Sequence, residues 1–150
     1  MIHQSHRLRA GRVSLIGQAY HVTFATDQRV PMLADFWAAH AVIHTIRHAD
    51  ELKLSETHAL TVMPDHVHWL FTLQLGDLSP LVGRVKTLSA RAIHRELGGS
   101  GTLWQRDFYD HAVRDDEALV DIARYIVANP LRAGLVKNVA DYSHWYARWL

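Results

Sequence analysis

The sequence contains no cysteine, and this absence removes several classes of site. Disulfides, zinc sites built on thiolates and a cysteine nucleophile are all excluded, which leaves histidine and the carboxylates as the side chains available to bind a metal. The 12 histidines are an unusual enrichment in a chain of 150 residues. We therefore expect any metal chemistry on this chain to depend on imidazole groups.

Long apolar runs and a strong net charge are also missing. No run approaches the roughly 18 apolar residues that cross a bilayer, and no apolar block of the signal type follows the start of the chain. We therefore expect a cytoplasmic protein without membrane contact. The formal charge is only +1, so contact with nucleic acid would depend on local clusters of lysine and arginine. The balance of 49% hydrophobic and 21% charged residues predicts one globular domain over residues 1–150.

Two histidines lie one residue apart in the segment Met-Pro-Asp-His-Val-His-Trp-Leu-Phe, residues 63–71. In an extended strand, side chains two apart point to the same face, so His66 and His68 would lie together while Val67 and Trp69 point to the other face. One face of this strand would then be apolar and the other able to hold a metal. A buried strand with two hydrogen-bonded histidines explains the same pattern, so the pattern alone decides nothing.

The periodicity of apolar residues predicts strands and helices in a definite order: strand, helix, strand, strand, helix and strand. These elements are residues 20–27, 36–52, 58–63, 66–75, 79–97 and 104–113. The order is typical of the split βαβ arrangement of ferredoxin-like and RNA-recognition-like (RRM-like) domains. We therefore predict an α+β fold, with two helices on one face of an antiparallel sheet and the paired histidines on the other face.

A third helix is predicted at residues 115–129, where acidic residues at the start suit the helix dipole. Tyr125 and Asn129 are four residues apart and therefore lie one turn apart on the same flank. Pro130 disfavours helical backbone at the preceding residue, so we expect the helix to end or kink at Asn129. The helix would present a phenol and an amide side by side.

Histidines also recur every four residues in the helix at 36–52. His40, His44 and His48 would be neighbours on its surface and could share a metal. No obvious fourth ligand lies nearby, so a solvated flank beside Trp37 is the favoured interpretation.

Basic residues cluster in two places. The helix at 79–97 carries Arg84, Lys86, Arg91 and Arg95 against one acid, Glu96. The start of the chain, residues 1–12, resembles a basic arm. Its arginines are Arg7, Arg9 and Arg12. For the helix, a merely solvated face explains the charges equally well.

Three motifs together resemble a known family. They are residues 63–68, the segment Trp-Gln-Arg-Asp-Phe-Tyr at 104–109, and Tyr-Ile-Val-Ala-Asn-Pro-Leu-Arg-Ala-Gly-Leu-Val at 125–136. In this order and spacing they resemble the REP-associated tyrosine transposases, which are single-tyrosine members of the HUH (His-hydrophobic-His) endonuclease superfamily. No second tyrosine stands four residues after Tyr125, in keeping with the one-tyrosine group.

The resemblance implies a role for each matching residue. His66 and His68 would be metal ligands for Mg²⁺ or Mn²⁺, Asn129 the third ligand, and Tyr125 the nucleophile. Relatives use glutamine at the third position, and asparagine offers the same carbonyl oxygen on a shorter side chain. A tyrosine hydroxyl is a weak nucleophile at neutral pH, so it needs a metal-polarised phosphate or a base.

The implied activity is metal-dependent nicking and rejoining of single-stranded DNA at a hairpin of the REP palindrome type, through a 5′-phosphotyrosine intermediate. The partner would be single-stranded or hairpin DNA, the protein a monomer or a homodimer, and its place the nucleoid. The basic clusters become candidate contacts to the DNA backbone. A non-catalytic binder of DNA hairpins is the alternative. An RNA-binding module of the same topology is less well supported, because the aromatic strand signature is missing.

Overall fold

The computed structural model describes residues 14–115 and 117–149, so the predicted basic arm, with Arg7, Arg9 and Arg12, lies outside the described residues. The strands are β1 (Ala19–Ala25), β2 (Ser55–Val62), β3 (His66–Leu73), β4 (Tyr109–Ala112) and β5 (Trp145–Ala147). The helices are α2 (Phe36–Glu51), α3 (Leu78–Leu97), α4 (Leu119–Val127) and α5 (Asn129–Arg132). Within the described ranges, no helix is long and apolar enough to cross a membrane.

The strands form one antiparallel sheet in the order β4-β1-β3-β2-β5. Its first four strands, with α2 and α3 between them in sequence, confirm the predicted α+β fold of the ferredoxin-like split βαβ type. The fifth strand was not predicted. It adds three residues to the free edge of β2, where Leu60 pairs with Tyr146, and it brings the C-terminal segment back onto the sheet.

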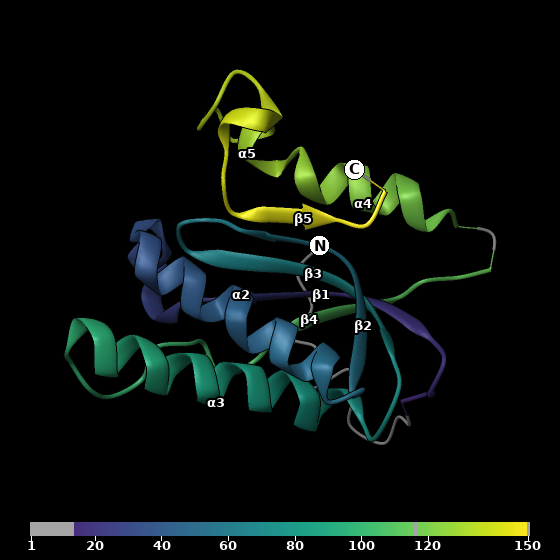
Figure 1. Ribbon diagram of the computed structural model, residues 1–150, viewed down its shortest axis with the longest axis horizontal. Coiled ribbons are helices and arrows are strands. Elements are labelled where there is room, and N and C mark those ends of the chain that lie inside the picture. Colours follow the sequence, from purple (N-terminus) through teal and green to yellow (C-terminus); the bar gives the residue numbers. More distant parts are fainter. Residues whose placement is uncertain (1–13, 116, 150) are drawn as a thin grey trace.

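The main core lies between one face of the sheet and the two long helices, α2 and α3, which lie side by side below the sheet in Figure 1. Val67, Trp69 and Phe71 point into this core and are fully buried, as the alternation in β3 predicts. The rings of Trp69 and Phe71 stack with centroids 3.9 Å apart. Each such buried side chain contributes about 1.5–3 kcal/mol, so this face is the main source of stability.

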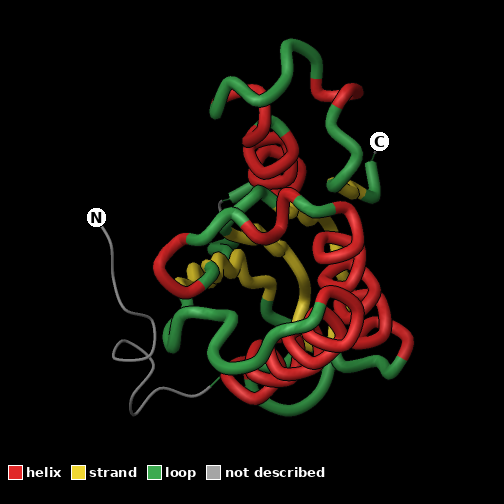
Figure 2. Tube along the Cα trace, turned by 90° about the vertical axis from the view of Figure 1, so that its left-hand side faces the viewer, coloured by secondary structure: helices red, strands yellow, loops and turns green. Residues whose placement is uncertain are grey.

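A smaller core occupies the opposite face of the sheet. Leu70 of β3 packs there with Ala123 and Ile126 of α4 and with Ala147 of β5. The helix α4 therefore covers the face of β3 that also bears His66 and His68, and the two groups of helices lie on opposite sides of the strands (Figures 1 and 2).

The start of α4 differs from the predicted helix. The helix begins at Leu119, not at Asp115, and Ala118 precedes it without a side-chain cap. The reason is that Glu117 is engaged elsewhere: its carboxylate accepts a hydrogen bond from the Arg114 amide at 2.8 Å and lies 2.9 Å from His111. These contacts hold the segment before α4 as a loop.

The end of α4 also lies earlier than predicted. The helix stops at Val127, and a short helix, α5, begins at Asn129 with Pro130 in its first turn. Tyr125 and Asn129 therefore belong to two successive helices and not to one. A break at Asn129 was predicted, but it falls at Ala128, and Asn129 is itself helical because Pro130 lies in the first turn of α5, where proline is tolerated.

Candidate functional site

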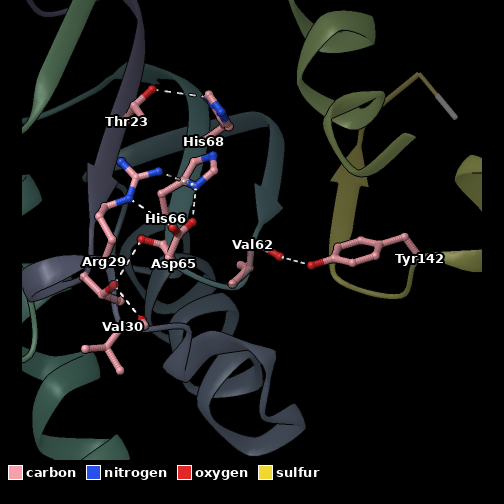
Figure 3. A network of polar contacts seen from close by, with 9 residues as sticks. Thr23, Arg29, Val30, Val62, Asp65, His66, His68 and Tyr142 are labelled. Carbon is pink, nitrogen blue, oxygen red and sulfur yellow. Dashed lines mark hydrogen bonds and ion pairs between the residues drawn. The ribbon is translucent and has the colours of Figure 1, made fainter. Parts of the chain in front are cut away.

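His66 and His68 lie together on β3, with ring centroids 5.0 Å apart. Both are half-buried and stand on the face opposite the main core. The neighbouring strands place Thr23 of β1 and Thr61 of β2 beside His68. Figure 3 shows the two imidazole rings next to each other above the turn that carries Asp65.

In both His66 and His68, the Nδ1 atom lies within hydrogen-bond distance of a neighbouring side chain. The Nδ1 atom of His66 lies 2.7 Å from the Asp65 carboxylate. The Nδ1 atom of His68 lies 3.0 Å from Nε2 of His21 and 3.2 Å from the hydroxyl of Thr23. Hydrogen bonds at Nδ1 orient an imidazole and leave Nε2 to bind a metal, which is the usual arrangement around a metal-binding histidine.

The protonation state of His68, and of its hydrogen-bond partner His21, suits metal binding at His68. Burial lowers the pKa of His68 to about 3, and the charges of His21, His66 and Arg132 act in the same direction. Burial, together with the charge of His111, lowers the pKa of His21 to about 4. Both rings are therefore neutral at neutral pH, and a neutral imidazole is the form that binds a metal.

Arg29 completes this cluster from the loop after β1. Its Nε atom donates to the Asp65 carboxylate at 3.0 Å. Burial alone would raise the pKa of Asp65, but the hydrogen bonds to His66 and Arg29 outweigh it and hold that pKa below its usual value. Gln28 and Arg29 have φ angles of 55° and 56°, which cost a residue other than glycine about 1–3 kcal/mol. Arg29 was not predicted as part of the site, because a single arginine in a loop forms no pattern.

The C-terminal end of α4 approaches the histidines from above the sheet. The Thr61 hydroxyl, across from His68, donates to the carbonyl of Ile126 at 3.0 Å. Tyr125, the preceding residue, is 56% exposed. The guanidinium of Arg132 lies 3.8 Å from the centroid of its ring. The charge of Arg132 also lowers the pKa of His68. The C-terminal ends of α4 and α5 therefore lie close to the paired histidines.

A metal held here would need a donor other than a third histidine or carboxylate. Among residues 14–115 and 117–149, no three histidine, aspartate or glutamate side chains group as a metal site. Two imidazoles are present in His66 and His68, and the half-buried Asn129, at the start of α5, carries an amide oxygen. This set of donors fits Mn²⁺ or Mg²⁺ if phosphate and water oxygens supply the remaining positions.

A small cavity of about 110 Å³ borders the cluster on the side of β4. Thr23, Arg29, Arg106 and Tyr109 line it. Of the aromatic residues in the 104–109 motif, Trp104 and Phe108 are buried in the main core, so these two have a packing role. Of the two arginines that line the cavity, Arg29 also lies 3.5 Å from the Nδ1 atom of His66.

The basic residues predicted on the helix α3 differ in their contacts. Lys86 donates to the carbonyls of Gln105, Arg106 and Asp107 at 2.6, 3.3 and 3.2 Å. Burial lowers its pKa to about 8, although the charge of Asp107 opposes this. Lys86 thus stabilises the segment before β4. Because its ammonium group is already engaged in these hydrogen bonds, the predicted contact of Lys86 with DNA is disfavoured. Arg84, Arg91 and Arg95 stay predicted DNA contacts.

The fold corresponds to that of a class of transposases. The family model described as "Transposase IS200 like" matches residues 14–129. The match covers most of the chain, so the chain belongs to this family.

Within the family, the chain is similar to REP-associated tyrosine transposases. It is 32% identical to the one from Escherichia coli K12 over 87 residues, which are 58% of this chain and 51% of that protein. It is 31% identical over 100 residues to a Haemophilus influenzae protein assigned to the same group, with 59% and 57% covered. The chain spans little more than half the length of these relatives.

Two solved structures have a similar fold. One is a REP-associated tyrosine transposase bound to a REP hairpin, with a TM-score of 0.68 and 27% identity over 89% of this chain and 79% of that one. The other is a Deinococcus radiodurans protein described as a transposase, with a TM-score of 0.55 and 28% identity over 75% and 91% of the two chains. The resemblance stated from the three motifs is thereby confirmed.

Proposed function

We propose that this protein is a metal-dependent enzyme that nicks and rejoins single-stranded DNA at or near a hairpin, with Tyr125 as the nucleophile. One observation carries the proposal: the helix that bears Tyr125 packs on the same sheet face as His66 and His68, with its C-terminal end beside His68. Similarity to a transposase solved with a REP hairpin supports hairpin DNA as the substrate class.

His66, His68 and Asn129 would hold Mg²⁺ or Mn²⁺. When bound, such an ion would polarise the scissile phosphate and offset its negative charge. Asp65 and His21 orient the two imidazoles through their Nδ1 atoms. They are positioning residues, because they act on the histidines and not on the DNA.

In the proposed step, the phenolic oxygen of Tyr125 attacks the phosphorus and the bond from phosphorus to the 3′ oxygen breaks. The phenolic proton passes to a base, and the departing 3′ oxygen takes up a proton. The products are a 5′-phosphotyrosine and a free 3′-hydroxyl. Because the ester bond is retained on Tyr125, attack by a 3′-hydroxyl can rejoin the strand without nucleotide hydrolysis.

Arg132 would assist this step through its contact with the tyrosine ring. A guanidinium 3.8 Å from the ring centroid restricts the orientation of the phenol. Its positive charge would also lie close to the phosphate under attack, where charge develops in the transition state. All of these residues belong to one chain, so a monomer would suffice, and the work on DNA would place the protein at the nucleoid.

The test uses a single-stranded oligonucleotide that contains a hairpin and is labelled at its 3′ end, since the 3′ fragment becomes attached to the protein. With Mn²⁺ or Mg²⁺, the wild-type protein should carry label through a denaturing gel, and Tyr125→Phe should not. Tyr146→Phe is the matched control, because Tyr146 is also exposed but stands on β5. An adduct with Tyr125→Phe would show that another residue is the nucleophile.

The alternative function is a non-catalytic binder of DNA hairpins. The short side chain of Asn129, which reaches less far towards an ion than that of glutamine would, favours it. Under this alternative, the wild-type protein would bind the hairpin with the same affinity as Tyr125→Phe and would form no adduct with either metal. If the protein bound the hairpin but did not cleave it with either Mg²⁺ or Mn²⁺, the enzyme hypothesis would be rejected in favour of the non-catalytic binder.

A further inference from the structure

A groove of about 550 Å³ runs between α2 and α3, on the outer side of the helical layer and away from His66 and His68. Small and apolar side chains form its floor. The α2 wall carries His40, His44 and His48, and the α3 wall carries Arg91 and Arg95. The histidines that recur every four residues therefore face a wall of arginines, an arrangement that the proposed nicking reaction does not use.

The α2 wall is a series of exposed rings. The ring of Phe36 stacks on that of His40, with centroids 5.8 Å apart and an interplanar angle of 9°. His40 in turn stacks on His44, at 5.7 Å and 26°. Trp37, which is 56% exposed, meets His40 edge-on. Of these rings, Trp37, His40 and His44 line the groove outside the core, and the parts of their surfaces that they do not cover for one another can stack on the bases of a single strand.

The α3 wall is positively charged. Arg91 and Arg95 are exposed, and Glu96 is the acid that lines the groove beside them. Arg84 reaches His48 with a terminal nitrogen at 3.3 Å. Its Nε atom is buried and has no hydrogen-bond partner among the described residues. The arginines outnumber the acid, so the charge of the groove complements phosphates.

We propose that this groove binds single-stranded nucleic acid, with phosphates on the arginine wall and bases on the ring wall. A duplex fits less well, because its bases are stacked on one another and closed to the rings. From Trp37 to His48 the helix rises about 16 Å at 1.5 Å per residue, which is the length of about five stacked nucleotides. A metal site is disfavoured, because residues 14–115 and 117–149 hold no group of three suitable ligands.

The proposal does not depend on the nicking reaction, since the groove and the candidate site lie on opposite faces of the sheet. It assigns the groove a different ligand from the hairpin itself, namely the single-stranded DNA that flanks a hairpin. The experiment is therefore done in the Tyr125→Phe background with EDTA, where neither nicking nor metal binding contributes.

The measurement is the binding of a fluorescent 12-nucleotide single strand, by anisotropy, across a range of salt concentrations. Removing two phosphate contacts with Arg91→Ala/Arg95→Ala should lower the salt slope by about 1.4. Loss of one stacked base with Trp37→Leu should weaken binding about 5- to 150-fold and remove the quenching of tryptophan fluorescence. Lys137→Ala, which removes an exposed charge beyond α5, should leave the slope and the affinity unchanged.

Three outcomes would overturn the proposal. The groove variants could bind the single strand as tightly as the parent protein, with an equal salt slope. A blunt hairpin without single-stranded tails could compete as well as the single strand, which would indicate a duplex site. Finally, the groove variants and Lys137→Ala could lose affinity equally, which would indicate a diffuse charge effect. Urea unfolding of each variant shows that it is folded.

Discussion

Acid should destabilise the metal-free protein through His21 and His68. Burial, the largest cause in both cases, lowers the pKa of these groups to about 4 and about 3, from 6.5 in the unfolded chain. Between the folded and unfolded values the unfolded state binds more protons than the folded state, so stability falls as the pH falls. The loss begins below about pH 6.5 and is complete only near pH 3.

The size of the effect at pH 5 follows from the unfolded pKa alone, because both folded values lie below pH 5. For each histidine, pH 5 lies about 1.5 units below the unfolded pKa of 6.5, and one unit corresponds to about 1.36 kcal/mol in the free energy of unfolding. The free energy of unfolding should therefore fall by about 2 kcal/mol per histidine, or about 4 kcal/mol in all, between pH 8 and pH 5. His58 and His144, whose pKa values burial also lowers, add to this.

Urea unfolding in EDTA at pH 8 and pH 5 measures this loss. The comparison is between the wild-type protein and His21→Gln/His68→Gln, because the double variant keeps the acid response of every other group. We expect the wild-type protein to lose about 4 kcal/mol more than the variant on acidification. An equal loss in both proteins would refute the conclusion that these two rings are buried in the neutral form.

Four further predictions follow from single contacts. Thr61→Val should cost about 1 kcal/mol in urea unfolding, because the bond to the Ile126 carbonyl is lost. Lys86→Met should cost about 1–3 kcal/mol by the same assay, since three carbonyls lose their donor. Arg132→Gln should slow adduct formation without weakening hairpin binding, as rapid quenching and anisotropy would show. His66→Ala should abolish Mn²⁺ binding in calorimetry, and unchanged binding would remove His66 as a ligand.

Periodicity predicted the six elements of the split βαβ fold because burial on one face repeats along each of them. The alternation in β3 correctly placed Val67 and Trp69 in the main core and left His66 and His68 on the opposite face. The strand β5 was missed because three residues cannot show a period. It forms through pairing with β2 and the burial of Ala147, both of which are contacts between distant segments.

The start of α4 was predicted wrongly for a related reason. Acidic residues at 115–117 suit a helix N-terminus by local rules, but the contacts of Glu117 with His111 and Arg114 outweigh them. The same limit applies to the site. The partners of the paired histidines, His21 and Arg29, are 47 and 37 residues away in sequence, and no local pattern marks a partner at that distance.

The two faces of the sheet divide stability from chemistry. The helices α2 and α3 bury most of the large apolar side chains, whereas the face under α4 holds a small core and a set of polar groups. Two features of that face are energetically unfavourable: the half-buried His68 lies beside other basic groups, and Gln28 and Arg29 adopt left-handed backbone. Strain and buried titratable groups of this kind gather where a fold serves a site. The main core on the opposite face buries far more large apolar side chains, and the free energy of that burial offsets these unfavourable features.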